Sequence, residues 1–186
     1  MAILASLLVI DLTEALAGPY ASMLLGDFGA DVIKIERPGV GDQSRKWGAK
    51  LPAGESAYFA STNRNKRSLT LNIQSVEGQA ILQRLLARAD VFLCNLPRLD
   101  SLQRAGIDPE TLLAKYPRLI YASITGYGRS GPRAGQSGYD AVAQGEAGLM
   151  TLTGTPDTVP LRYPIPIADM TTGLYTVIGV LAALRA

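Results

Sequence analysis

The sequence predicts one open α/β domain, in which helices cover both faces of a mainly parallel, Rossmann-like sheet. Two observations predict this class. Apolar segments of strand length alternate along the chain with segments of helical spacing, as in successive β–α units. The strand segments are apolar on both faces, which is typical of parallel strands buried on both sides. The 186 residues, 47% of them hydrophobic, are enough for one sizeable core.

Five segments are predicted to be strands. Most are short, apolar and rich in β-branched residues, and in the third apolar and polar residues alternate. In chain order the expected strands cover residues 7–12, 31–36, 68–73, 91–94 and 119–124. Ligands of such sheets bind beyond the carboxyl ends of the strands. The candidate site is therefore formed by the segments that follow the strands, at residues 13–19, 37–42, 72–74, 95–97 and 126–138.

The helices are predicted from their end residues and from the apolar spacing between them. Pro19 suits the first turn of the first helix and Gly29 suits its C-cap, while Asp108 suits the N-cap of the third. In chain order the expected helices cover residues 20–28, 76–88, 109–115, 139–150 and 172–185. The last helix is apolar all round. We expect a further part of the chain, or a second chain, to cover it.

Composition excludes several kinds of site. The chain has no histidine, which excludes a Ser-His-Asp triad and most zinc sites. Its single cysteine, Cys94, excludes an intrachain disulfide and a CxxC metal site. Cys94 lies in an apolar segment, which favours a buried thiol over a nucleophile. We expect no metal site, and any acid, base or nucleophile to be an Asp, Glu, Lys, Tyr, Ser or Thr side chain.

Charge and hydropathy bear on location and partners. A net charge of +2 without a run of like charges gives no support for a nucleic-acid partner. The first ten residues lack the basic segment and cleavage pattern of a signal peptide. No apolar run approaches the ~20 residues of a membrane span. We therefore expect a cytoplasmic protein with no membrane partner.

A glycine-rich motif follows the fifth predicted strand, at residues 126–131. Its spacing matches the dinucleotide-binding pattern G-x-G-x-x-G, which requires a helix to begin at once. Here Pro132, Gly135 and Gly138 follow instead, so the loop continues. A loop that lines a site, or a plain turn, is favoured over an NAD site.

Asp169 immediately precedes the long apolar segment near the end of the sequence. An aspartate in this place is a good helix N-cap, and the helix dipole favours its ionised form. An ionised carboxylate at a helix start can also be a nucleophile. Helix-start statistics alone favour the cap.

An ordered set of motifs resembles the class III coenzyme A-transferase family, which includes formyl-CoA transferase, carnitine CoA-transferase and α-methylacyl-CoA racemase. Each motif is weak alone, but their order along the whole chain is specific. The matching stretches are residues 9–13, 17–19, 29–38, 63–71, 89–91, 117–121, 126–128, 139–144 and 168–170.

The resemblance implies the architecture and the partners. Family members are about twice as long, so residues 1–186 correspond to one CoA-binding α/β domain, the N-terminal part of a longer chain. The smaller domain and the returning C-terminal segment of the family are absent, and we expect this chain alone to be inactive. The resemblance also implies an interlocked homodimer, and coenzyme A and acyl-CoA as substrates, with no permanently bound cofactor.

The resemblance also assigns site residues. Asp169 falls on the family's nucleophilic aspartate, which overturns the preference for a cap alone. Arg37 and Arg104 are the candidates for the phosphates of CoA, because arginine binds phosphate bidentately. The full set of implied CoA contacts is Leu16, Ala17, Arg37, Leu71, Asn72, Ile73, Gln74, Asn95, Leu96, Pro97, Arg104, Ser137, Gly138, Tyr139 and Asp140.

Four positions depart from the family pattern. Gln74 stands where a lysine is usual, which puts one phosphate contact in doubt. Leu16 stands where formyl-CoA transferases have glutamine, which argues against formate and oxalate. Leu96 replaces a common phenylalanine, and Ser137 a lysine of the formyl enzymes.

Three functions remain open at this point. The first is a transferase that moves CoA from an acyl-CoA to a carboxylic acid through an aspartyl anhydride and an aspartyl-CoA thioester. The second is a racemase of the α-methylacyl-CoA type. Racemases carry a histidine where this chain has Tyr139, so the absence of histidine favours the transferase. The third is a non-catalytic, truncated half that binds CoA.

Overall fold

A five-stranded parallel sheet forms the centre of the protein. The computed structural model describes residues 2–186. The strands follow the order β3-β2-β1-β4-β5, and every neighbouring pair is parallel. They are β1 (Leu8–Leu12), β2 (Asp31–Glu36), β3 (Lys66–Thr70), β4 (Val91–Cys94) and β5 (Ile120–Ser123). The predicted open α/β class with a parallel sheet is confirmed.

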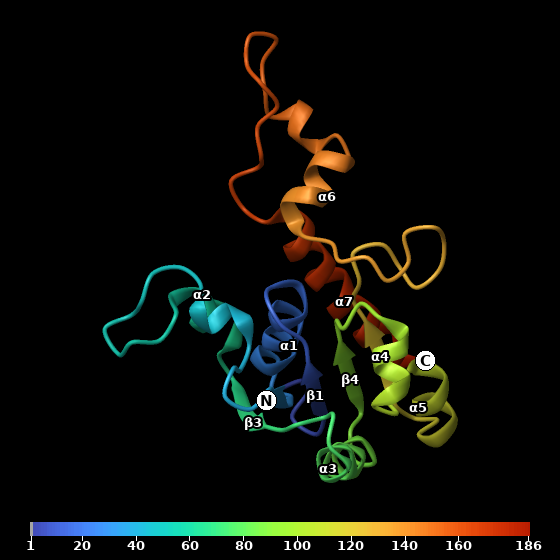
Figure 1. Cartoon of the computed structure of the whole chain (residues 1–186). Coiled ribbons are helices and arrows are strands. Elements are labelled where there is room, and N and C mark those ends of the chain that lie inside the picture. Colours follow the sequence, from blue (N-terminus) through green and yellow to red (C-terminus); the bar gives the residue numbers. More distant parts are fainter. Residues whose placement is uncertain (1) are drawn as a thin grey trace.

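Helices cover both faces of this sheet (Figure 1). They are α1 (Ala17–Asp27), α2 (Ala57–Asn63), α3 (Val76–Leu86), α4 (Leu99–Arg104), α5 (Pro109–Lys115), α6 (Asp140–Glu146) and α7 (Ile167–Arg185). Two short 3₁₀ helices are η1 (Gln43–Lys46) and η2 (Leu149–Leu152).

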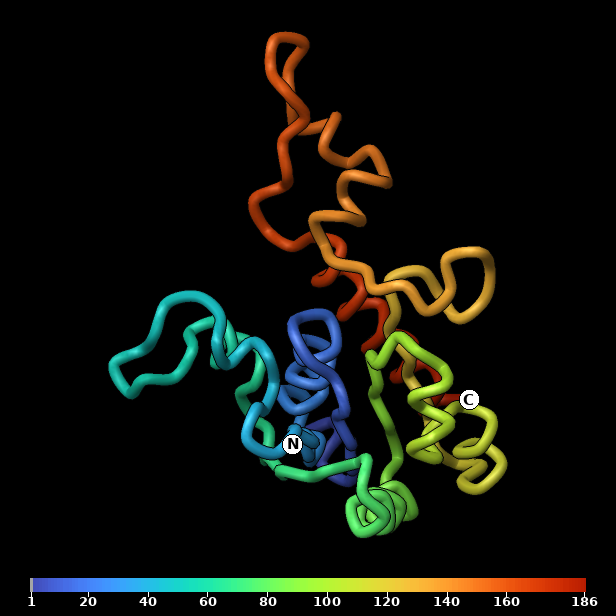
Figure 2. The backbone as a smooth tube through the Cα atoms, in the orientation of Figure 1, coloured from blue at the N-terminus to red at the C-terminus, as the bar shows by residue number. Residues whose placement is uncertain are grey.

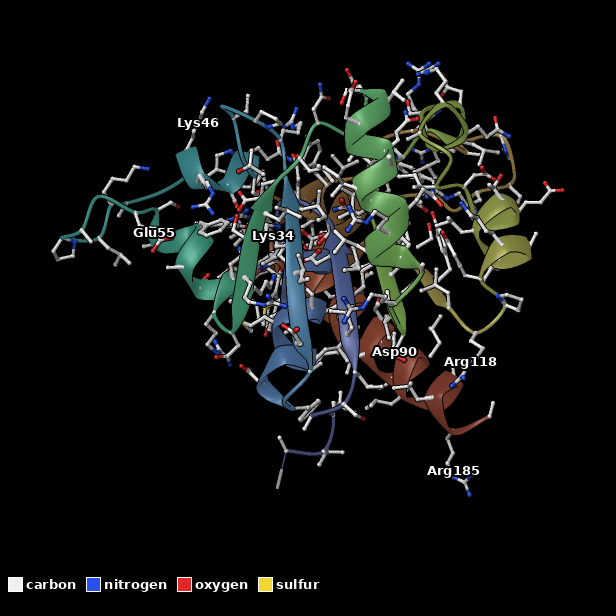
Figure 3. All side chains as sticks on the ribbon, turned by 90° about the horizontal axis from the view of Figure 1, so that it is seen from below. Lys34, Lys46, Glu55, Asp90, Arg118 and Arg185 are labelled. Carbon is white, nitrogen blue, oxygen red and sulfur yellow. The ribbon has the colours of Figure 1, made fainter. Side chains whose placement is uncertain are left out.

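Two hydrophobic clusters lie on opposite faces of the sheet. Ile10 of β1 packs in the cluster that contains α3, α4 and α5, whereas Val9 packs in the cluster that contains α1 and α7. Consecutive strand residues point to opposite faces, so apolar pairs of this kind bury both faces at once. Figure 3 shows α3 in front of the strands, with α1 and α7 behind them. The alternation of strand and helix segments along the sequence predicted a sheet with helices on both faces, and this prediction is confirmed.

Several predicted boundaries are wrong by a few residues. The third strand is 66–70 rather than 68–73, and the segment 139–150 divides into α6 and η2. The first helix begins at Ala17 rather than residue 20. The last begins at Ile167 rather than residue 172, and Pro166, whose φ is −74°, occupies its N-cap.

Three elements were not predicted: η1, α2 and α4. Helix α2 begins where the side chain of Ser56 accepts a hydrogen bond from the N–H of Phe59, at 3.1 Å. This serine cap lies in the region that the sequence presents as irregular. Both α2 and α4 span less than two turns, too short for a helical period to show.

Three segments extend from the body of the domain, as the tube in Figure 2 shows. They are the residues near 47–56, the loop 126–138, and the segment from η2 to about residue 165, which projects farthest. The last segment carries exposed apolar side chains, among them Leu152 at 79% and Val159 at 73% exposure. These residues contribute little to either cluster of the core.

Helix α7 buries one face and exposes the rest. Gly173, Val177 and Val180 are buried against α1, whereas Tyr175 and Ile178 are 70% and 58% exposed. Within residues 2–186, α7 alone is long and apolar enough to cross a membrane, with a mean hydropathy of 1.6. Length and composition do not separate a membrane span from a core helix, so the expected absence of a membrane partner stays a prediction.

Candidate active site

A cavity of about 1290 Å³ opens at the carboxyl ends of the strands. The strand order changes direction between β1 and β4, so the chain leaves these two neighbouring strands toward opposite sides and a crevice remains between the departing loops. The walls come from the segments after all five strands and from the first turns of α1, α6 and α7. The cavity therefore lies where the sequence placed the candidate site.

All of the residues that the resemblance assigned to the site line this one cavity. They come from distant parts of the sequence, and the fold brings them together. Lining residues from the prediction are Leu16, Ala17, Arg37, Leu71, Asn72, Ile73, Gln74, Asn95, Leu96, Pro97, Arg104, Ser137, Gly138, Tyr139, Asp140 and Asp169. Their roles toward CoA stay predictions.

Two arginines give the cavity a basic rim. The guanidinium of Arg37 lies 3.0 Å from the carboxylate of Glu14, and that of Arg104 lies 3.0 Å from the carboxylate of Asp100. The two side chains are 58% and 70% exposed, so they remain able to reorient toward an anion. Each carboxylate holds its arginine near the rim.

Asn95 joins the two loops at the crevice. Its side-chain N–H donates to the carbonyl of Glu14 at 2.8 Å, and its side-chain oxygen accepts from the N–H of Glu14 at 3.1 Å. Asn95 follows β4 and Glu14 follows β1, so the amide ties the two loops across the point where the strand order changes. Asn95 is a predicted CoA contact, but the nitrogen and the oxygen of its side chain both already bond to the protein backbone.

A buried ionic cluster holds the loop that follows β1 in place. Lys34, which is 1% exposed, donates to the carbonyl of Thr13 at 2.7 Å and lies 2.8 Å from the carboxylate of Asp42. Burial alone lowers the pKa of Lys34, but the charges of Asp11 and Asp42 outweigh burial and raise it. Figure 3 shows Lys34 in the middle of the sheet, far from the peripheral charges at Lys46 and Arg185.

The same loop holds a residue in an unusual backbone conformation. Ala15 has a φ of +73°, a left-handed value that costs an L-residue about 1 kcal/mol or more. Its N–H donates to Asp42 at 3.3 Å. The contacts at Thr13, Glu14 and Ala15 together hold the turn that leads into α1, whose first residues line the cavity.

Asp169 lies in the first turn of α7 and is only partly buried. The prediction that it caps the helix is wrong, because the N-cap is Pro166 and Asp169 is the third helical residue. The helix dipole favours the ionised form of Asp169, but other effects outweigh it. Burial, and then the negative charge of Asp140, raise the pKa of Asp169 to about 6. With a pKa of about 6, the ionised form of Asp169 predominates at pH 7.

The cap of α7 comes from another helix. The carboxylate of Asp140, at the start of α6, accepts from the N–H of Ala168 at 2.8 Å and from the N–H of Asp169 at 3.4 Å. These N–H groups lack partners within the helix, and a carboxylate satisfies them as a cap residue does. The nucleophile candidate is thus fixed by its own backbone to a second carboxylate.

The cysteine and the glycine-rich motif have structural surroundings. Cys94 is fully buried, and burial raises the pKa of its thiol to about 11. No helix follows residues 126–131 directly, as expected. A Cβ at Gly126 would lie 2.5 Å from the Cα of Gly138, so the two ends of the loop 126–138 touch through their backbones. This contact holds the start of α6 beside the end of β5.

Comparisons with known proteins agree with this geometry. The family model "CoA-transferase family III" matches residues 4–186. The chain belongs to this CoA-transferase family. A succinate–glutarate CoA-transferase from Agrobacterium fabrum is 44% identical over 187 residues, which cover 97% of this chain and 46% of the relative. The human succinyl-CoA:glutarate CoA-transferase is 45% identical over 95% of this chain and 40% of its own length.

Two solved structures have the same fold. A CAIB/BAIF family protein from Brucella suis superimposes with a TM-score of 0.91 at 44% identity, over 97% of this chain and 48% of that one. A protein from Mycobacterium tuberculosis gives a TM-score of 0.89 at 36% identity, over 98% of this chain and 51% of that one. The chain spans about half the length of the relatives and structures that it matches, in agreement with an N-terminal portion of the family's sequence.

Several residues of the site were not found from the sequence. The buried ionic cluster that holds the loop after β1 is formed by Asp11, Lys34 and Asp42. Gln144 bonds to Asp140. Tyr58 is the fifth. Burial raises the pKa of its hydroxyl, as do the negative charges of Asp169, Asp140 and Asp42. Two of these residues, Asp11 and Lys34, could have been found from the sequence. Each is a charge within a strand segment, 8–12 or 31–36, and a charge in a strand that is buried on both faces requires a partner.

Proposed function

We propose that the full-length protein is a CoA-transferase that moves coenzyme A between an acyl-CoA and a free carboxylic acid. One observation carries this proposal: a partly buried carboxylate, Asp169, and a basic rim with Arg37 and Arg104 share one cavity. The cavity thus offers a nucleophile to a thioester and cations to the phosphates of CoA. The family membership supports the same reaction.

The chemistry follows from an ionised Asp169. A carboxylate oxygen attacks the thioester carbonyl, the carbon–sulfur bond breaks and the CoA thiolate leaves, which gives an acyl–aspartyl anhydride. The thiolate then attacks the aspartyl carbonyl, the first acid leaves as its carboxylate, and an aspartyl-CoA thioester remains. The acceptor carboxylate reverses these two steps. Two acyl transfers replace one direct exchange, which is the advantage of covalent catalysis.

The raised pKa of Asp169 suits a carboxylate that must be a good nucleophile and must also be ionised at pH 7. A carboxylate of higher pKa is a stronger nucleophile in the first step, because nucleophilicity rises with basicity. At about 6 the pKa is still low enough for the ionised form to dominate at pH 7. No histidine base is required, in agreement with a sequence that has none.

The names of the relatives suggest which acids to test. Relatives are named for succinate and glutarate, and one from Chloroflexus aurantiacus for L-malate. Short dicarboxylic acids are therefore the first acceptors to test. As the family resemblance implies, we also propose a homodimer with no permanent cofactor, and from the sequence we propose a cytoplasmic location and no metal ion.

The racemase alternative requires a proton shuttle at the α-carbon. Tyr139 stands where the resemblance places the histidine of racemases, and the sequence holds no histidine at all. Proton exchange at neutral pH is best served by histidine, whose reference pKa is about 6.5. The transferase is therefore preferred. The non-catalytic alternative predicts CoA binding without turnover.

The test compares Asp169→Asn and Asp169→Ala with the parent in the full-length protein. Both variants are expected to lose transfer from succinyl-CoA by at least a thousandfold while CoA affinity survives. Incubation of the parent with acyl-CoA and hydroxylamine should leave a hydroxamate on Asp169, detected by mass spectrometry. Near-parental transfer by Asp169→Asn, with deamidation excluded, would refute the nucleophile.

A second arm tests the basic rim. Arg37→Ala and Arg104→Ala together are expected to weaken CoA binding at least tenfold. A charge-assisted hydrogen bond contributes roughly 1.5–3 kcal/mol, and solvent exposure reduces this amount. Isothermal titration with CoA, and with NAD as a negative control, measures the effect. Parental affinity in the double variant would refute the phosphate assignment and leave the nucleophile assignment intact.

A further inference from the structure

The cap of α7 belongs to a larger buried polar group. The side-chain N–H of Gln144 donates to the second carboxylate oxygen of Asp140 at 2.6 Å. The side-chain oxygen of Gln144 accepts from the N–H of Tyr163 at 2.8 Å. Gln144 is 1% exposed and Asp140 is 8% exposed. One end of the group therefore holds the extended approach to α7, and the other end holds its first turn.

Both oxygens of Asp140 are thus already occupied. One accepts from the backbone of Ala168 and Asp169, and the other accepts from Gln144. A buried carboxylate with these partners has little capacity left for a ligand. The phosphates of CoA are also anionic, so a carboxylate would repel them. The resemblance assigned Asp140 to CoA, but the geometry directs its side chain at the nucleophile's backbone.

We propose that Asp140 and Gln144 form a clamp that positions Asp169, and that Asp140 is not a ligand of CoA. The clamp fixes the first turn of α7, from which the carboxylate of Asp169 extends into the cavity. A hydrogen-bonded cap of this kind has a strong directional preference, so the backbone of Asp169 has one defined position. This inference rests on the proposed role of Asp169.

The clamp is itself attached to the sheet. Gly138 lies two residues before Asp140, and its backbone touches Gly126, which follows β5. A side chain at either glycine would collide with the backbone of the other. The glycine-rich motif therefore has a role after all: it brings Asp140 close to the end of β5. The contact between the two glycines thus attaches α6 to β5, and Asp140 attaches α6 to α7.

The clamp also sets the charge that Asp169 experiences. The other groups that face Asp169 are the hydroxyl of Tyr58 from α2 and the neutral first turn of α1. Asp140 is the charged group that acts on its titration. Removal of this negative charge should make Asp169 easier to ionise, so its titration midpoint should fall. Greater exposure of Asp169 to water would lower the midpoint in the same direction, so the kinetic readout below is needed beside the titration.

The test uses Asp140→Asn, Gln144→Met and the control Asp157→Asn in the full-length protein. Asp157 is an exposed carboxylate outside the cavity, so its variant removes an equal charge elsewhere. Carboxyl ¹³C NMR follows the titration of Asp169, assigned by its loss in Asp169→Asn. Asp140→Asn is expected to lower the midpoint by about one pH unit, and Asp157→Asn to leave it unchanged.

Kinetics provide the second readout. Gln144→Met has a side chain of similar length without hydrogen-bonding groups, and is expected to lower kcat about tenfold with KM for acyl-CoA within twofold. CoA affinity should stay within twofold of the parent in Asp140→Asn. A tenfold loss of CoA affinity with an unchanged midpoint would overturn the clamp and restore Asp140 as a ligand. An unchanged kcat in Gln144→Met would overturn it as well.

The two proposals fail in different ways. If the parent does not transfer CoA at all, the proposed function is wrong, while the NMR titration still tests the clamp. If the parent transfers CoA through another residue, Asp169→Asn stays active and the clamp loses its catalytic meaning. If Asp140→Asn does not fold, Gln144→Met keeps the clamp open to refutation through kcat.

Discussion

At Gly173, α7 closely approaches α1, and replacement of this glycine should displace Asp169, the proposed nucleophile. A Cβ on Gly173 would lie 2.9 Å from the carbonyl oxygen of Ala17 and 2.9 Å from Cδ1 of Tyr20. Ordinary contacts of a Cβ begin near 3.4 Å, so α7 must move by about 0.5 Å. Gly173 is four residues after Asp169 on the same helix face, so the movement reaches Asp169.

The magnitude follows from two opposing effects. Overpacking costs roughly 1–3 kcal/mol, and alanine regains about 1 kcal/mol of helix propensity. We expect Gly173→Ala to be about 0–2 kcal/mol less stable than the parent. A displacement of about 1 Å can cost a hundredfold in rate, so a movement half as large should cost transfer about tenfold.

Gly179 provides the matched control. It lies on the same helix and is exposed, and a Cβ at this position would meet no other atom within 4 Å. Gly179→Ala should therefore gain up to about 1 kcal/mol of stability. Urea unfolding of both variants of this chain, and transfer rates of Gly173→Ala in the full-length protein, measure the difference. If Gly173→Ala matches Gly179→Ala in stability and the parent in kcat, the close approach of the two helices is not what positions Asp169.

Two further predictions concern titratable groups away from Asp169. Cys94 should not react with a disulfide reagent at pH 8 in the native protein and should react fully in urea, because burial raises its pKa to about 11; fast native reaction would contradict its burial. For Glu36, burial raises the pKa, but hydrogen bonds from Arg45 and Ser68 outweigh it and lower the pKa to about 2. Its contribution, on the order of 3 kcal/mol, is complete above about pH 4.5 and lost as the pH falls toward 2. Urea unfolding across this range should show a shallower decline in Glu36→Gln than in the parent, and equal slopes would contradict the assignment.

The fold could be predicted because its signals are local. Apolar strand segments and helical spacing indicated the class and most elements to within a few residues. The missed elements depend on tertiary contacts instead. Helix α2 requires Ser56 to accept from the N–H of Phe59, and α4 gives too short a pattern. The early start of α7 depends on Asp140, whose partners at Ala168 and Asp169 are 28 and 29 residues away.

The site could be predicted only in part. The rule that ligands bind beyond strand ends located it, and the resemblance named residues that do line one cavity. Neither source could show which side chains face inward. Asn95 and Asp140 line the cavity, yet each uses its side-chain polar atoms on the protein itself. A residue's presence in a binding segment therefore does not assign its side chain to the ligand.

The polar groups around the cavity share one physical arrangement. Lys34 with Asp42, Asn95, and Asp140 with Gln144 each bond to the backbone of a segment that lines the cavity. Backbone groups in loops lack the partners that helices and strands provide, so buried side chains that satisfy them also hold them in place. Burial of these polar side chains costs more free energy than burial of apolar ones, but their hydrogen bonds fix the direction of the groups that they contact. A covalent nucleophile needs such constraint, because its carboxylate must meet the substrate's carbonyl and afterwards present its own carbonyl to the thiolate from the same helix turn.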